Sequence, residues 1–166
     1  MFYQPRPGAA IEEIDTPALL LDLDAFEHNL RLMAAFFADK PTALRPHAKT
    51  HKCPEIARRQ IKAGAIGITC AKLGEAQALV DGGIQDVLIA NEVVGATKTG
   101  RLATLARRAD LMVAVDNASN VTELSKACEA KDSSIRVLVD VDVGMGRCGV
   151  QRSEDAIVVE GPTYAV

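Results

Sequence analysis

Short apolar runs alternate with longer amphipathic segments along most of the chain. The runs lie at residues 43–49, 65–70, 87–90, 111–115 and 135–141. All but the first are rich in valine and isoleucine, as strands covered on both faces of a parallel sheet must be. The segments between the runs begin near polar residues or proline and several close at glycine, which is typical of helices. The pattern therefore predicts an α/β fold of about five strand–helix units with parallel strands.

The amino-terminal region is expected to contribute an arm, a strand and a helix. Residues 1–14 carry proline and glycine without a hydrophobic period, which predicts a mobile arm or strap. Residues 17–23 form an apolar run that predicts a short buried strand. Asp24 and Glu27 then have the spacing of a helix capping box. A core-facing stripe is expected on that helix at Phe26, Leu30, Met33 and Phe37.

Repeated strand–helix units form either a doubly wound open sheet or a closed (β/α)8 barrel. A closed barrel usually takes about 250 residues, and this chain has 166. We therefore expect either an open sheet or the first part of a longer barrel. The run at residues 156–159 is followed by a Gly-Pro break and has no partner unit, which favours the second alternative.

Composition and charge exclude several classes of function. With 48% hydrophobic and 25% charged residues, the chain is expected to form a soluble globular domain rather than a disordered or fibrous one. The 19 Lys and Arg against 22 Asp and Glu give no basic field, so we expect no nucleic-acid partner. No apolar segment is long enough to cross a membrane. The four cysteines form no CxxC pair, so we expect reduced thiols and a cytoplasmic protein without membrane partners.

The densest polar cluster lies at residues 45–52 and allows three interpretations. It is a solvated strand end, whose basic side chains face water. Alternatively, His47, His51 and Cys53 bind a metal ion such as zinc. The third interpretation is a lysine, Lys49, held in a barrel mouth where neighbouring cations lower its pKa and free its amine to attack an aldehyde. Spacing alone leaves all three open.

A second polar segment, residues 140–149, carries three glycines around Arg147. Glycines at this spacing allow positive φ angles in a tight turn. They do not form a dinucleotide-binding motif, because no apolar helix follows them. Taken by itself, Arg147 could pair with Asp140 or Asp142 at the surface.

Together these segments resemble a known family. The string RPHAKTHK at residues 45–52, preceded by TPALLLDLD at residues 16–24, is similar to the amino-terminal part of the D-threonine aldolase and D-serine dehydratase family. Residues 67–76, 86–93 and 140–149 resemble later segments of the same family. The resemblance covers about residues 11–151, which is less than half of a typical member. It is strongest to the aldolases that act on D-threonine or D-3-hydroxyaspartate.

The resemblance implies a partial alanine racemase-like barrel that binds pyridoxal 5'-phosphate. Lys49 would form the Schiff base with the cofactor, and Arg147 would reach its phenolic oxygen. His47 shares the predicted face of Lys49 and would either adjust its pKa or act as a hydrogen-bonded structural residue. The implied activity is retro-aldol cleavage of D-β-hydroxy amino acids to glycine and an aldehyde. The alternatives are β-elimination, as in D-serine dehydratase, cofactor binding without turnover, and an inactive truncated fragment.

The resemblance also divides the chain. It implies an arm at residues 1–14, part of the cofactor-binding barrel at residues 15–151 and a divergent tail at residues 152–166, without the family's carboxyl-terminal β domain. In the family the missing parts supply the ligands of a divalent metal, so we assign no metal ligand here. We expect a small D-amino acid as substrate, and family likeness suggests a homodimer.

Overall fold

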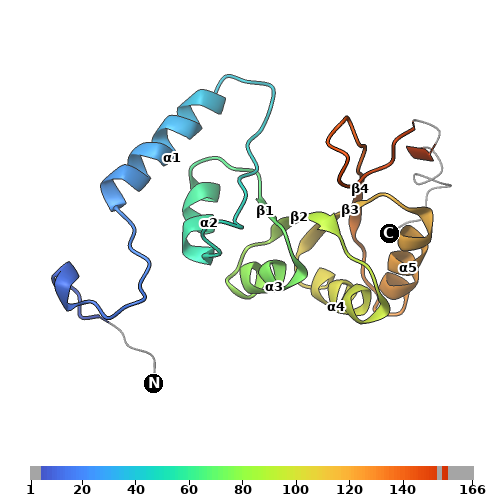
Figure 1. Cartoon of the computed structure of the whole chain (residues 1–166), viewed down its shortest axis with the longest axis horizontal. Helices are drawn as coiled ribbons and strands as arrows, with labels where there is room; N and C mark the ends of the chain where they lie inside the picture. The colour runs from blue at the N-terminus through green and yellow to red at the C-terminus, as the bar shows by residue number, and fades with distance from the viewer. Residues whose placement is uncertain (1–4, 153–154, 157–166) are drawn as a thin grey trace.

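The centre of the fold is a parallel sheet. The structure is a computed structural model that describes residues 5–152 and 155–156. In the described region the sheet has four strands in the order β1-β2-β3-β4, so neighbours in sequence are neighbours in space (Figure 1). This confirms the predicted α/β fold with parallel strands. The strands are β1 (Ile68–Cys70), β2 (Asp86–Glu92), β3 (Asp110–Val115) and β4 (Arg136–Val139).

Three helices connect these strands and cover one face of the sheet (Figure 1). They are α3 (Leu73–Asp81), α4 (Ala96–Ala106) and α5 (Ala118–Glu129). Alternate strand residues such as Val87, Val113 and Val115 are fully buried, because successive side chains of a strand point to opposite faces. In β2, β3 and β4 the other set is only half-buried, as at Met112, or exposed, as at Leu138. One face of the sheet therefore packs on helices, and the other is open.

The strand expected at residues 43–49 is reduced to a single bridge between His47 and Thr69. The N–H of Ala48 donates to the carbonyl of Thr69 at 2.7 Å, and the N–H of Thr69 donates to the carbonyl of Pro46 at 2.8 Å. Proline has no N–H and removes one bond from the ladder. The chain then turns at residues 48–51, so the strand does not continue through Lys49. The helix expected next is confirmed as α2 (Pro54–Lys62), which begins at Pro54.

The prediction of a strand at residues 17–23 is wrong. These residues pair with no strand of the described region, and Leu19 is 98% exposed. Helix α1 (Leu23–Phe37) begins instead at the end of this run, because Oδ1 of Asp22 accepts a hydrogen bond from the N–H of Ala25 at 2.9 Å. The cap is therefore Asp22 and not Asp24. No residue of α1 is buried, so the expected core-facing stripe does not reach the described core.

Parts of the expected arm and tail lie outside the described residues. These are residues 1–4 of the arm and residues 153–154 and 157–166 of the tail, which include residues 157–159 of the carboxyl-terminal apolar run. The rest of the arm contains a 3-10 turn, Ile11–Glu13, with no buried residue. None of the described helices has the length and apolar character needed to cross a bilayer. All four cysteines are free thiols, as predicted.

Candidate functional site

Polar side chains gather at the carboxyl ends of the parallel strands. Lys49 follows the segment that is bridged to β1, and Glu92 is the last residue of β2. Asp116 follows β3, and Asp140 follows β4. Because parallel strands end at the same edge of a sheet, these residues share one edge. In α/β proteins this edge is where ligands bind.

Lys49 lies in the turn that ends the bridged segment. The preceding residue, Ala48, is buried at 2% exposure and anchors the turn in the core. The N–H of Lys52, a residue with a positive φ of 49°, donates to the carbonyl of Ala48 at 2.7 Å and closes the turn. Lys49 itself is exposed. Its amine is therefore accessible to a small aldehyde arriving from solvent.

His47 is half-buried beside Lys49. Its Nδ1 accepts a hydrogen bond from the backbone N–H of Lys49 at 3.1 Å. Burial lowers the pKa of His47, and the charge of Lys49 lowers it further, while Glu75 and a hydrogen bond with the Thr69 backbone oppose the shift. The lowered pKa favours the neutral imidazole, the form whose Nδ1 can accept this bond. Because Nδ1 accepts, the proton of the neutral ring is on Nε2.

The metal site considered for His47, His51 and Cys53 is not formed. Nδ1 of His51 accepts a hydrogen bond from the backbone N–H of Cys53 at 3.0 Å, and burial lowers the pKa of His51. In residues 5–152 and 155–156, the only group of three ligand-type side chains close enough to share a metal ion is a different one. It consists of Glu92, Asp140 and Cys148.

The ligand atoms of that group lie within 4.8 Å of one another. The Cys148 thiol donates to Oδ2 of Asp140 at 3.2 Å. This hydrogen bond raises the pKa of Cys148, and the charge of Glu92 adds to the shift. A protonated thiol accounts for the close approach without an ion. Sequence reasoning missed Glu92, although an acidic residue at the end of an apolar strand is a recognisable signal.

Arg147 lies in the glycine-rich turn that follows β4. The carboxylate of Asp142 accepts hydrogen bonds from the N–H groups of Gly144 and Gly146, each at 2.9 Å, which lowers the pKa of Asp142. Both glycines have positive φ angles, 115° and 65°, as predicted for a tight turn. Arg147 is exposed and its side chain contacts Cys148, where it partly offsets the rise in the thiol pKa. Among the described residues, no ion pair joins Arg147 to Asp140 or Asp142.

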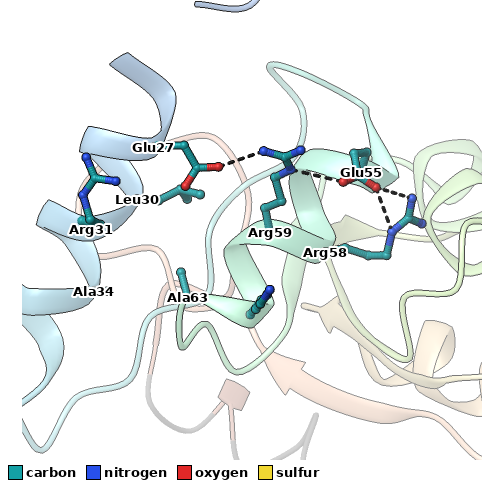
Figure 2. Close-up of a pocket in the computed structure, with 9 residues that line it drawn as sticks. Glu27, Leu30, Arg31, Ala34, Glu55, Arg58, Arg59 and Ala63 are labelled. Atoms are coloured by element: carbon teal, nitrogen blue, oxygen red, sulfur yellow. Dashed lines mark hydrogen bonds and ion pairs between the residues drawn. The ribbon is translucent and has the colours of Figure 1, made fainter. Parts of the chain in front are cut away.

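A cavity of about 610 Å³ lies between α1 and α2 (Figure 2). Arg59 bridges it, because its guanidinium binds Glu27 of α1 at 2.8 Å and Glu55 of α2 at 3.2 Å (Figure 2). Neither Lys49 nor Arg147 lines this cavity. Its ion pairs join two helices and give no reason to place the chemistry there.

Comparison with known proteins decides the family. The family described as "Alanine racemase, N-terminal domain" matches residues 21–160. The chain belongs to this family. Over 154 residues it is 53% identical to a D-threonine aldolase of Arthrobacter sp., covering 93% of this chain and 40% of that protein. It is 39% identical over 155 residues to a 3-hydroxy-D-aspartate aldolase of Paracoccus denitrificans, covering 92% of this chain and again 40% of the relative.

A solved structure of a D-threonine aldolase shows the same fold. The crystal structure of D-threonine aldolase from Filomicrobium marinum has a TM-score of 0.84 and 51% sequence identity. The match covers 88% of this chain and 39% of that one. The chain thus spans about 40% of the length of the relatives it matches. The resemblance to the aldolases and the partial alanine racemase-like α/β fold are confirmed.

Proposed function

We propose that this chain carries the cofactor-binding lysine of a pyridoxal 5'-phosphate-dependent lyase. The substrate class is D-β-hydroxy amino acids, cleaved between Cα and Cβ to glycine and an aldehyde. One observation carries the proposal: an exposed lysine, Lys49, lies at the carboxyl edge of a parallel sheet, in a chain 53% identical to a D-threonine aldolase.

The residues of this edge fit the cofactor chemically. Lys49 offers an accessible primary amine for the pyridoxal aldehyde. Arg147 offers a permanent positive charge, which suits a phenolate oxygen. The buried thiol of Cys70 does not compete as a nucleophile, since burial raises its pKa to about 12.

When bound, pyridoxal phosphate supplies an electron-poor ring that stabilises the electron pair left at Cα of the substrate. Lys49 would hold the cofactor through its ε-amino group, and Arg147 would place its positive charge at the phenolic oxygen. Neutral His47 fixes the main chain at Lys49 through its Nδ1. A divalent metal, which the resemblance also implies, has no assigned ligand among the described residues, and neither has the base that accepts the β-hydroxyl proton.

Chemical labelling tests the cofactor assignment. The purified chain is mixed with pyridoxal phosphate, reduced with borohydride and mapped by peptide mass spectrometry. We expect the label on Lys49 and its loss in Lys49→Ala. The matched control is Lys52→Ala, an exposed lysine of the same turn, which should keep the label on Lys49. A label on another lysine, or none, would refute the assignment.

Product analysis then separates the candidate reactions. The cofactor-loaded chain is incubated with D-threonine and a divalent metal ion. Glycine with acetaldehyde supports aldol cleavage, whereas ammonia with a keto acid supports β-elimination. If Lys49 is labelled but neither product forms, the chain binds the cofactor without turnover. The chain spans about 40% of its aldolase relatives, which is the observation that favours testing this last alternative.

A further inference from the structure

We infer that Arg45 and Asp86 form a clamp that positions Lys49 for its bond to the cofactor. The inference rests on the proposed function. The guanidinium of Arg45 binds the carboxylate of Asp86 through two parallel bonds, Nη1 to Oδ1 at 2.7 Å and Nη2 to Oδ2 at 3.2 Å. Bidentate pairs of this kind fix orientation as well as distance. We call this pair the Arg45–Asp86 clamp.

The Arg45–Asp86 clamp is partly buried and packs against Gly67. The side chain of Arg45 is only 14% exposed, and that of Asp86, the first residue of β2, is 32% exposed. Gly67 lies against both. A Cβ atom at this position would lie 2.8 Å from Cζ of Arg45 and 2.9 Å from Cγ of Asp86. Because Gly67 has no side chain, the side chains of the Arg45–Asp86 clamp can occupy this space.

The clamp acts on Lys49 through the short stretch of main chain that joins it to Arg45. Along this stretch, two backbone bonds tie the chain to β1, the one from Thr69 to the carbonyl of Pro46 and the one from Ala48 to the carbonyl of Thr69. Pro46 adds no donor of its own, so this bridge is weaker than a regular ladder. The side-chain clamp supplies the second fixed point, at the start of the segment whose end presents the amine.

The ion-pair network suggests which variants to use. Asp86 also binds Arg136 at 3.3 Å, so Arg45→Met leaves the carboxylate with a cationic partner. Arg45→Lys keeps the positive charge but cannot form the two parallel hydrogen bonds of a guanidinium group. The matched control is Asp110→Asn, which weakens the exposed pair between Asp110 and Arg136 at 2.7 Å and leaves the clamp intact.

The first readout is hydrogen exchange in the cofactor-free chain, followed for the peptide that contains residues 44–49. Loss of a charged hydrogen bond should speed exchange there by about tenfold in Arg45→Met. Arg45→Lys should show a smaller increase, and Asp110→Asn should match the wild type. If Arg45→Met fails to fold, as judged by circular dichroism, Arg45→Lys carries the comparison. Wild-type exchange in the folded variants would overturn the clamp.

The second readout is the borohydride-fixed adduct on Lys49 as a function of pyridoxal phosphate concentration. We expect Arg45→Met to need about tenfold more pyridoxal phosphate than the wild type for half-labelling of Lys49. Arg45→Lys should need a concentration between those two, and Asp110→Asn should need the same concentration as the wild type. Faster exchange with unchanged labelling would overturn the positioning role while the proposed function stands. A wild-type chain without label on Lys49 would overturn both, which keeps the two failures distinguishable.

Discussion

Lys49 donates its backbone N–H to Nδ1 of His47, two residues earlier, at 3.1 Å. The side chain of His47 thus folds over the turn that presents the lysine. An imidazole can accept this bond only while Nδ1 carries no proton. Protonation of His47 would therefore remove the acceptor and place two positive charges side by side.

The first prediction is that the folded chain loses stability as the pH falls below about 6.5, the usual pKa of histidine. Burial lowers the pKa of both His47 and His51. In the window just below the usual value the unfolded chain binds more protons than the folded one. The stability that the two neutral histidines contribute is fully present above this window. It is lost as the pH falls through the window toward their lowered pKa values. Thermal unfolding at about pH 7.5 and about pH 5.5 measures the change.

Glutamine variants provide the control. Glutamine does not titrate, and its side-chain oxygen can accept the hydrogen bond that Nδ1 accepts in the wild type. His47→Gln and His51→Gln should each reduce the difference between the two unfolding midpoints, and the double variant should reduce it most. The same difference in the wild type and the double variant would assign the pH dependence to other groups.

The second prediction concerns the packing of Gly67. Alanine at this position would place its Cβ against Arg45 and Asp86, so one of the two must move. We expect Gly67→Ala to lower the free energy of unfolding by about 1–3 kcal/mol, as overpacking usually does. Urea unfolding measures this loss.

Gly74 is the matched control. It lies in α3, and a Cβ atom added there would have no neighbour within 4 Å. Alanine favours a helix over glycine by roughly 0.5–1 kcal/mol. Gly74→Ala should therefore leave stability unchanged or raise it. Equal losses for Gly67→Ala and Gly74→Ala would mean that the space beside the clamp is not the cause.

Helices were predictable because their signals are local. The segment between the apolar runs at residues 65–70 and 87–90 was expected to be helical, and it forms α3, since its apolar period and the glycines that follow lie within the same short stretch. Helix α2 begins at Pro54, as expected of a proline in the first helical turn. Such signals need no knowledge of distant neighbours.

A strand forms only where it finds a partner strand, and for this reason the sequence-based prediction of strands was less accurate. Residues 17–23 have the apolar composition of a strand, but Leu19 is exposed and the segment pairs with no strand of the described region. Residues 43–49 do find a partner in Thr69. They form only one bridge, because Pro46 lacks a donor and the chain turns at Ala48.

Site residues could be predicted from the sequence only where they lie in a segment that resembles a known family. Lys49 and Arg147 were assigned by resemblance, and their roles stay predictions. The contact between Arg45 and Asp86 spans 41 positions and depends on how the bridged segment and β2 lie across β1, which composition does not reveal. Glu92 joins the site for the same reason, since its place is set by the register of β2.

The third prediction concerns the turn that carries Arg147. The carboxylate of Asp142 binds the N–H groups of Gly144 and Gly146, and these bonds hold its pKa below the usual value. The stabilisation is therefore present at neutral pH and is lost only when acid protonates the carboxylate. Asp142→Ala should loosen the turn, speeding hydrogen exchange at residues 144–149 by about tenfold.

A loosened turn would also weaken the hold of Arg147 on the cofactor. We expect Asp142→Ala to need about fivefold more pyridoxal phosphate for half-labelling of Lys49. Asp142→Asn should lie between this variant and the wild type, because its amide oxygen keeps one acceptor. Asp39→Ala, which removes an exposed carboxylate elsewhere in the chain, should change neither exchange in the turn nor labelling. If Asp142→Ala loosened the turn and labelling stayed as in the wild type, Arg147 would have no part in holding the cofactor.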